Sequence, residues 1–476
     1  MTDFIGRKQE LQKLQRLLKK SSASLIVVRG RRRIGKSRLI EEFGKGHKTY
    51  IFSGIPPTEK TNKEDQLREF GRQLGKALEQ PPFLDSDWND LFIRLASHTR
   101  RGRVIILLDE ISWMGSKDPM FLSKLKNIWD LEFKKNPKLI LVLCGSVSSW
   151  IEKNILNSTG FLGRISLDLF LEELPLRDCN HFWDKGGPHV SAYEKFKILA
   201  VTGGVPKYLE EIHPEYTAEE NIKNLCFDRA GLLFNEFDNI FSDIFSKRSE
   251  IYKKIVTCID DGHYQYEEIY RKLGIEKSGL ISEYLKDLMT SGFIQRDYTW
   301  QIKTGKQSKL SNYRISDNYI RFYLTNIFPN KDKIGRGSFQ NLSLGLIPGW
   351  ESILGLQFEN LVLHNRRILQ EILNIKPEDI NYENPFFQSK TVRQEGCQID
   401  YMIQTRFDVL YVCEIKFSKH PIGSTILEEM KQKIKKLHLP KRMSCRPIVI
   451  HVNGVSEAVL QSRYFADIID FSQFLT

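Results

Sequence analysis

Short apolar runs and helical patterns alternate over the first part of the 476-residue chain. Leu25–Val28 is a β-rich apolar run, and apolar residues at helical spacing follow from Leu39 to Phe43. Two more apolar runs, at 104–110 and 139–146, end in polar residues. Unbroken apolar runs of this length are typical of strands buried in a parallel sheet. The pattern therefore predicts an α/β domain with a parallel sheet over residues 1–175.

The pattern changes after residue 245. Residues 249–297 contain three short helical patterns, the last with Ser278 as its N-cap, and residues 293–316 alternate like two strands. This order predicts a winged helix over 246–325. The mixed charge on its last helix is as consistent with a spacer or protein-contact module as with DNA binding. The Lys- and Gly-rich tip at 303–309 favours nucleic acid.

The formal net charge of +12 favours a polyanionic partner. Residues 416–446 hold nine Lys or Arg and two Glu, which is also the pattern of a solvated helix face. The seven cysteines include no C-x-x-C pair, which argues against a disulfide framework and a zinc ribbon. No stretch reaches the roughly 18 apolar residues of a membrane span. We expect a cytoplasmic protein with no membrane partner.

A glycine-rich loop follows the first apolar run, with the pattern G-x-x-x-x-G-K-S and a helical pattern after it. Strand, loop and helix in this order are typical of a phosphate-binding loop (P-loop). Its glycines let backbone N–H groups face the phosphates, the lysine meets their charge, and the serine offers a hydroxyl to Mg²⁺. The three arginines either shape the loop or touch a neighbouring subunit. The predicted nucleotide contacts are Gly30, Arg31, Arg32, Arg33, Ile34, Gly35, Lys36, Ser37 and Arg38.

The other two apolar runs end in residues that suit the same site. Asp109 would hold Mg²⁺ through water, and Glu110 would orient or deprotonate the attacking water. Ser146 either senses the γ-phosphate or simply ends its strand. Arg164 is a candidate arginine finger, with an ordinary surface arginine as the alternative. The expected cofactors are ATP and Mg²⁺.

The motifs "DFIGRKQELQKL", "GRRRIGKS", "LLDE", "LCGS" and "GGVPKYL" occur in this order. In this the chain resembles the archaeal-type P-loop ATPases of the AAA+/STAND group over about residues 1–245. The resemblance implies a helical lid at 176–245 and homo-oligomers as an option. It also implies that four residues lie near the adenine and ribose: Gly6, Arg7, Gly204 and Pro206.

Acidic residues recur in two alternating runs near the C-terminus. The run at 395–403 holds Asp400, and the run at 408–418 holds Glu414 and Lys416. If the two strands pair as a hairpin, Asp400 meets Glu414, and period-two alternation puts Lys416 on the same strand face as Glu414. The carboxylates offer hard oxygen ligands to Mg²⁺ or Mn²⁺, and the lysine can position a water or steady developing negative charge.

This grouping resembles the D…E-x-K site of restriction-endonuclease-like nucleases, and implies an α/β domain of that kind over 326–476. The resemblance implies that Glu359, in the apolar helix "LGLQFENLVLHN", joins the metal site and that Gln432 touches a phosphate. Ile399 stands where such sites usually have proline. An inert copy of the domain stays open.

We therefore expect an ATP-binding and ATP-hydrolysing protein that acts on nucleic acid, DNA ahead of RNA, with a metal-dependent nuclease site near the C-terminus. Two alternatives remain. One is a nucleotide-dependent switch whose C-terminal domain binds without cutting. The other is a DNA-binding regulator that works through the winged helix.

Overall fold

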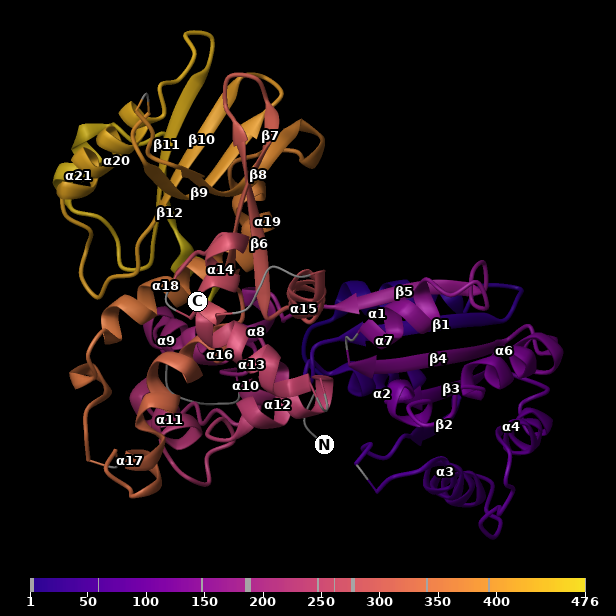
Figure 1. The fold of residues 1–476 in the computed structure, drawn as a ribbon. Coiled ribbons are helices and arrows are strands. Elements are labelled where there is room, and N and C mark those ends of the chain that lie inside the picture. Colours follow the sequence, from indigo (N-terminus) through magenta and orange to yellow (C-terminus); the bar gives the residue numbers. More distant parts are fainter. Residues whose placement is uncertain are drawn as a thin grey trace. The chain divides into compact units, whose positions relative to one another are not determined.

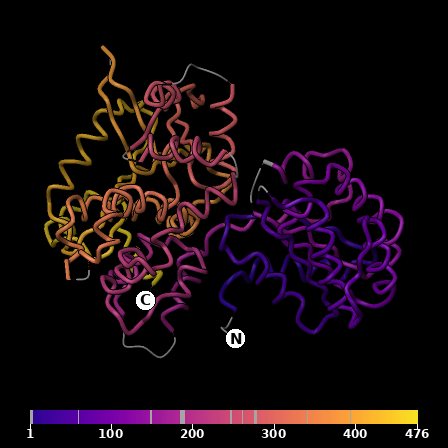
Figure 2. The backbone as a smooth tube through the Cα atoms, turned by 60° about the horizontal axis from the view of Figure 1, so that its bottom comes forward, coloured from indigo at the N-terminus to yellow at the C-terminus, as the bar shows by residue number. Residues whose placement is uncertain are grey.

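The structure is a computed structural model. It describes residues 4–58, 60–146, 149–184, 190–245, 248–260, 262–274, 279–339, 341–392 and 394–475. Contacts divide the chain into two units, whose courses can be followed by residue number in Figure 2. The first unit is Met1–Leu174 with Ile240–Lys247, and the second is Pro175–Asn239 with Arg248–Thr476. Ser278, the expected helix cap, lies outside the described residues.

A parallel five-stranded sheet in the order β2-β3-β4-β1-β5 forms the centre of the first unit (Figure 1). Its strands are β1 (Ser24–Gly30), β2 (Lys48–Ser53), β3 (Val104–Asp109), β4 (Leu139–Ser146) and β5 (Ile165–Leu171). Its helices are α1 (Lys8–Leu17), α2 (Lys36–Gly44), α3 (Lys63–Ala77), α4 (Trp88–Ser97), α5 (Ile111–Met114), α6 (Phe121–Leu131) and α7 (Ser149–Ile151). The predicted parallel α/β fold is confirmed.

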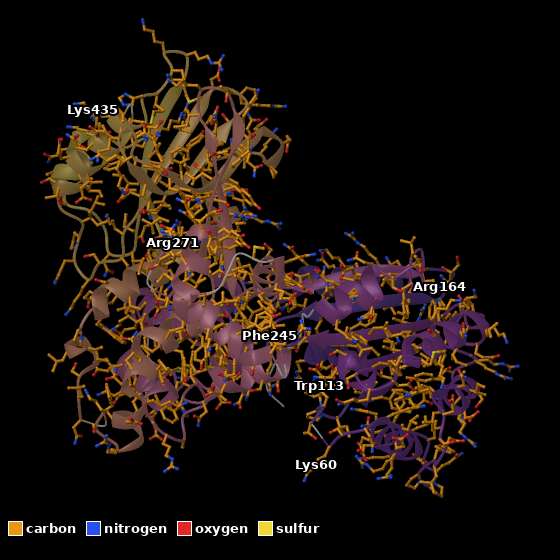
Figure 3. All side chains as sticks on the ribbon, viewed as in Figure 1. Lys60, Trp113, Arg164, Phe245, Arg271 and Lys435 are labelled. Carbon is orange, nitrogen blue, oxygen red and sulfur yellow. The ribbon has the colours of Figure 1, made fainter. Side chains whose placement is uncertain are left out.

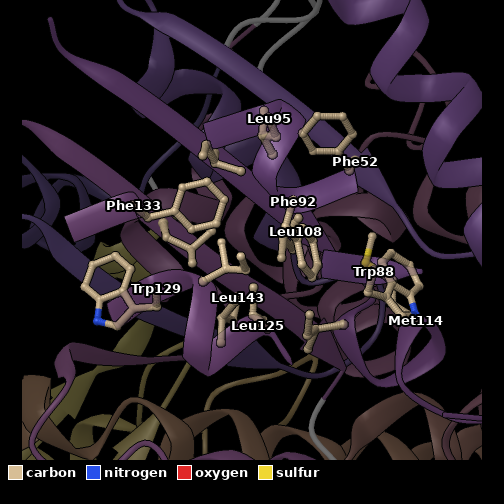
Figure 4. Packing of buried hydrophobic residues seen from close by; sticks show 14 of the residues in the cluster. Phe52, Trp88, Phe92, Leu95, Leu108, Met114, Leu125, Trp129, Phe133 and Leu143 are labelled. Carbon is tan, nitrogen blue, oxygen red and sulfur yellow. The ribbon is translucent and has the colours of Figure 1, made fainter. Parts of the chain in front are cut away.

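Alternate residues of the buried strands feed two separate cores, one on each face of this sheet. Leu25 and Val27 pack with the aromatic residues of α3 and α4, in the cluster drawn in Figure 4. Ile26 and Val28 pack on the other face with residues of α2. Because all five strands are parallel, the C-terminal ends of β1, β3 and β4 meet at one edge, where ligands of open α/β sheets bind.

The second unit begins with helices, continues through a hairpin and ends in another sheet. The first group of helices is α8 (Leu176–Asn180), α9 (Ala192–Thr202), α10 (Pro206–Leu209), α11 (Ala218–Cys226) and α12 (Glu236–Phe245), the last of which crosses the division between the units. There follow α13 (Ser249–Cys258), α14 (Tyr266–Leu273), α15 (Gly279–Thr290) and the antiparallel strands β6 (Ile294–Gln301) and β7 (Lys306–Ile315). This is the element order that the winged-helix prediction requires.

The rest of the second unit is a mixed sheet in the order β12-β11-β10-β9-β8. Strands β8 to β10 pair antiparallel, and β10 to β12 pair parallel. The strands are β8 (Ile380–Gln388), β9 (Cys397–Thr405), β10 (Val409–Ile415), β11 (Ser444–His451) and β12 (Asp467–Asp470). The helices are α16 (Asn318–Phe322), α17 (Lys331–Gly335), α18 (Trp350–His364), α19 (Arg366–Ile372), α20 (Thr425–Lys436) and α21 (Glu457–Ser462).

Candidate functional site

The glycine-rich loop joins β1 to α2 at the C-terminal edge of the parallel sheet. A Cβ on Gly30 would lie 2.6 Å from the carbonyl oxygen of Leu171, so this close approach requires glycine. Gly35 has φ +86°, a left-handed conformation that glycine adopts without strain, and α2 begins at the next residue. The loop therefore wraps around the N-terminus of α2, where backbone N–H groups and the helix dipole favour an anion.

Lys36 is buried in this loop, and its ammonium group donates three hydrogen bonds. Its Nζ donates to the carbonyl oxygens of Gly30 at 3.2 Å and Arg31 at 3.1 Å, and to Ser146 Oγ at 3.5 Å. Ser146 is opposite Gly30 in the register of β4 and β1, so both strand ends meet at the lysine. The geometry places the ammonium at the mouth of the phosphate loop and puts Ser146 beside it.

Ser37 and Asp109 meet across the edge of the sheet. The Ser37 hydroxyl donates to Asp109 Oδ2 at 2.6 Å, and Asp109 Oδ1 accepts from the backbone N–H of Glu110 at 3.0 Å. A hydroxyl and a carboxylate are the protein oxygens that hold Mg²⁺ in P-loop nucleotide hydrolases. The side chains present therefore fit that ion.

Glu110 caps α5 with a left-handed backbone, φ +50°. Burial raises the pKa of its carboxyl group, and the nearby Lys36 ammonium opposes that rise. Its Oε2 is buried without a hydrogen-bond partner among the described residues. An unsatisfied buried acceptor suits a group that orients a water molecule.

Most arginines around the loop contact acidic side chains or backbone carbonyls of the same unit. Arg7 is buried and donates to the carbonyl oxygens of Ile34 at 3.1 Å and Glu172 at 2.6 Å. The other ion pairs are Arg31 with Glu173, Arg32 with Asp243, and Arg38 with Glu41. For the loop arginines, these contacts favour a role in shaping the loop over contact with a neighbouring subunit.

Arg164 lies at the opposite end of the sheet from Lys36. Arg164, labelled in Figure 3, precedes β5. Because Ile165 pairs with Leu25 at the start of β1, the strand rise of about 3.3 Å per residue puts Arg164 about 20 Å from the loop. Its guanidinium binds Asp130 at 2.8 Å and holds the pKa of that carboxyl group well below its usual range. Arg164 therefore does not reach the phosphate site of its own chain; action on another copy stays a prediction.

The expected adenine-side residues are divided between the two units. Gly6, with φ +71°, directly precedes Arg7 in the first unit. Gly204 and Pro206 belong to the second unit, where Pro206 is the first residue of α10. Their contact with adenine and ribose stays a prediction.

A cavity of about 520 Å³ in the second unit gathers the carboxylates predicted near the C-terminus. Its walls come from α18, the β9–β10 pair and α20. The lining residues used below are Glu359, Asp400, Glu414, Lys416, Lys433 and Lys436. The helix α18, the two strands β9 and β10, and the basic helix α20 therefore all line one cavity.

The strand register explains the meeting of Asp400 and Glu414. Tyr401 pairs with Cys413, so the next positions along the antiparallel ladder are Asp400 and Glu414. Asp400 Oδ2 accepts from the backbone N–H of Ile415 at 2.8 Å. Burial first, and then the Glu414 and Glu359 carboxylates, raise the pKa of Asp400 to about 8.

Glu414 is 2% exposed and is held by two lysines. Lys416 Nζ lies 3.0 Å from its Oε1, and Lys433 Nζ donates to its Oε2 at 2.5 Å. Lys416 also lies 3.5 Å from Glu429 of α20. The ammonium groups therefore occupy positions around Glu414 that a metal cation would contest.

Glu359 contributes a third carboxylate from α18. Burial raises its pKa, and Glu414 adds to the rise. Among the residues that the structure describes, no three metal-ligating side chains already stand close enough to hold an ion. The donor set is nevertheless of the right kind, because crowded carboxylates are the oxygen ligands that Mg²⁺ and Mn²⁺ prefer.

Two lysines that the sequence did not single out line this cavity. Lys433 and Lys436 follow Gln432 on α20, and they point toward the site. Gln432 is exposed and donates to Glu428 one helical turn away, and its contact with a phosphate stays a prediction. Helical phase, once the helix bounds are known, separates Lys433 from Gln432.

The hairpin of β6 and β7 packs against the C-terminal sheet. Trp300 and Ile302 belong to the same apolar cluster as Met402 and Leu410. The Tyr382 hydroxyl donates to the Gly305 carbonyl at the hairpin tip, at 2.6 Å. This tip was the best argument for a DNA-binding wing, but part of it is engaged within the unit.

The fold and the loop geometry define the first unit as a P-loop nucleotide-hydrolase domain. Residues 4–212 match the family described as an ATPase domain predominantly from Archaea. In this part the chain belongs to that family and carries an archaeal-type P-loop ATPase domain.

Individual proteins also resemble the chain. An uncharacterized protein of Methanocaldococcus jannaschii is 28% identical over 338 residues, which are 71% of this chain and 71% of that protein. An uncharacterized ATP-binding protein of the same organism is 48% identical over 40 residues, which are 8% of this chain and 68% of that protein. The Walker-type ATPase of Pyrococcus abyssi shares the fold with a TM-score of 0.53 at 17% identity, over 68% of this chain and 96% of that one.

The described helices include none that is both long and apolar enough to cross a membrane.

Proposed function

We propose that the protein binds and hydrolyses ATP with Mg²⁺ and acts on nucleic acid through a metal-dependent nuclease site in its second unit. The observation that carries the nuclease proposal is the convergence of Asp400, Glu414 and Lys416 in one cavity, with Glu359 as a third carboxylate. The name of one relative, an ATP-binding protein, agrees with the first part of the proposal.

At the phosphate loop, each side chain has a separate task. The loop N–H groups and Lys36 bind the β- and γ-phosphates, while Ser37 and Asp109 hold Mg²⁺. Mg²⁺, when bound, neutralises charge that develops on the phosphates. Glu110 orients the attacking water, and burial raises the pKa of its carboxyl group, which makes the carboxylate a better proton acceptor.

At the C-terminal cavity, Asp400 and Glu414 would hold Mg²⁺ or Mn²⁺, with Glu359 as a further ligand or as a partner for a metal-bound water. The metal would supply a water that ionises near neutral pH. Lys416 then holds that water or stabilises negative charge on the phosphodiester under attack. Lys433 and Lys436 at the rim, together with the other lysines of α20, would bind the neighbouring phosphates.

The two sites lie in different units of one chain, so we further propose that nucleotide state controls cleavage. The test compares plasmid, linear DNA and RNA with and without ATP, in Mg²⁺ or Mn²⁺. Cleavage by the wild type that is lost in Asp400→Ala and Lys416→Ala is the expected result. Equal cleavage with and without ATP would contradict the proposal that nucleotide state controls cleavage. Cleavage that survives both substitutions would contradict the assignment of the nuclease site to Asp400 and Lys416.

A switch whose C-terminal domain binds without cutting is the second candidate. It is favoured by the two lysines on Glu414, which already compensate that carboxylate without a metal. It predicts nucleic-acid binding that depends on Lys433 and Lys436, together with no cleavage under any of the conditions above. Sequence-specific binding that depends only on the 303–309 tip would instead favour a regulator.

A further inference from the structure

Helix α18 lines the cavity and also contacts a buried polar network. Leu356 and Glu359 line the cavity. The neighbouring residues Gln357 and Asn360 are both buried and polar, with several hydrogen bonds. A buried polar side chain is costly unless it is bonded, so these contacts fix the rotation of the helix as well as its position.

Arg314 joins the hairpin to this helix. The side chain is 1% exposed, and its Nε donates to Asp297 at 2.6 Å, its second terminal nitrogen to Gln295 at 3.1 Å, and its first to Asn360. Asp297 and Gln295 lie on β6, whereas Asn360 lies on α18. The planar guanidinium fork reaches three acceptors in fixed directions, which a lysine cannot do.

Arg321 makes a second link from α16. It donates to the Ile315 carbonyl at 2.5 Å, and to the Leu356 carbonyl of α18 at 3.2 Å. Gln357 extends the link, because its Nε2 donates to the carbonyl oxygens of Asn318 at 2.6 Å and of Ala200 in α9 at 2.8 Å. The helix that carries Glu359 is therefore attached to the hairpin, to α16 and to α9.

The apolar side of the hairpin packs against the C-terminal sheet. Trp300 Nε1 donates to Gln404 of β9 at 2.5 Å, and the indole stacks on Tyr382 with ring centres 5.2 Å apart. Gln404 lies on the strand that carries Asp400. The hairpin therefore contacts two of the three elements that bring carboxylates to the cavity, β9 and α18.

We propose that Arg314 and Arg321 are positioning residues for the C-terminal site, and that the hairpin supports the elements that line this site. The proposal rests on the proposed metal site and names further residues that hold it. Apolar residues could stabilise the same packing at least as well, since buried ion pairs repay little of their desolvation. The arginines instead fix the orientation of α18. Arg314 bonds Asn360, the residue next to Glu359, and Arg321 bonds the Leu356 carbonyl of the same helix.

The test uses the full chain without nucleotide and compares three variants. Asn360→Ala removes the acceptor for Arg314 on α18 and, with it, the donor to the Ile315 carbonyl. Arg314→Lys keeps the charge opposite Asp297 but loses the fork. Arg296→Gln is the matched control, because Arg296 donates to Ser311 within the same hairpin and not to α18. Hydrogen exchange of residues 350–364 reports the helix. Mn²⁺ binding that Asp400→Asn abolishes reports the site.

Both test variants should exchange the α18 amides faster than the wild type and bind Mn²⁺ about tenfold more weakly, the lower end of the usual loss for an outer-shell change. The control should do neither. Unchanged exchange in both test variants would overturn the proposal. So would faster exchange with unchanged Mn²⁺ affinity, because the network would then only stabilise the helix. Wild type without Asp400-dependent Mn²⁺ binding would refute the proposed metal site itself, and the exchange data would still decide whether the network holds α18.

Discussion

The phosphate loop and the C-terminal cavity both bring lysines and carboxylates together, but their charges are balanced differently. In the loop, Lys36 binds carbonyl and hydroxyl oxygens, and Asp109 accepts from Ser37 and a backbone N–H. In the cavity, burial, together with the neighbouring Glu414 and Glu359 carboxylates, raises the pKa of Asp400 to about 8. The first site fits the proposed binding of an anion and a metal together. The second concentrates negative charge that a divalent cation would relieve.

The largest effect should come from the loop lysine. Lys36→Ala should lower ATP hydrolysis about 100- to 1000-fold, because a positioned charge on the phosphates is lost. Phosphate release under saturating ATP and Mg²⁺ measures it. Lys45→Ala, at the C-terminal end of the same helix and paired with Glu42 on the surface, is the control and should stay within about twofold. Comparable losses in both variants would mean that the helix, and not the charge, was disturbed.

The cavity should respond separately. Asp400→Asn should lower nuclease activity about 100-fold, the size of a lost metal ligand, while ATP hydrolysis is unchanged. Gel assays of cleavage and phosphate release on the same preparation provide both values. Asp408→Asn, at the exposed turn of the same hairpin, serves as the control. If Asp400→Asn also lowered ATP hydrolysis, the chemistry of the two sites would be coupled.

The carboxylate crowding predicts an unusual pH dependence of stability without divalent metal. Asp400 has a pKa of about 8 in the folded unit, against about 3.9 for a free aspartate. As pH rises from about 4 to 8, the unfolded chain loses this proton and the folded unit keeps it, so the contribution to stability falls. Asp400→Asn should therefore melt a few degrees above the wild type at pH 8 and level with it near pH 4. Calorimetry at both pH values checks this, and a pH-independent difference would contradict it.

The smallest effect should come from Arg164. Its ion pair with Asp130 is partly exposed, so Arg164→Ala should cost about 0–1 kcal/mol of stability in the first unit. At high dilution ATP hydrolysis should be unchanged, because the residue lies at the far end of the sheet. Activity that falls only at high protein concentration would identify Arg164 as a group that acts on another copy. A loss at every concentration would contradict the placement described above.

The two sites also differ in how much of them the sequence could predict. The phosphate loop is eight contiguous residues, and strand, loop and helix patterns surround it, so local sequence predicts its local structure. Asp109 and Ser146 follow because parallel strands end at one edge. The parallel α/β fold was also predictable from local sequence, because unbroken apolar runs of this length are typical of strands buried in a parallel sheet.

The cavity depends on long-range packing, and there the sequence predicts less. The pairing of Asp400 with Glu414 needs one hairpin and was predictable. The approach of Lys433 was not, since it depends on the rotation of α20 against the sheet. The link from Arg314 to Asn360 joins residues that are 46 positions apart, and no local pattern marks it. Arg164 was a candidate through its motif, and only the strand direction shows that it lies far from the loop.

The position of the Trp300 indole in the C-terminal core limits where recombination between related genes can give a folded protein. A winged helix that merely precedes another domain could be exchanged by recombination at the junction near residue 320. Here such an exchange would remove an aromatic side chain from the interior of the sheet and leave Gln404 without its donor. The segment from about 290 onward should therefore pass between genomes as one block, and viable hybrids should have their crossover points before the hairpin.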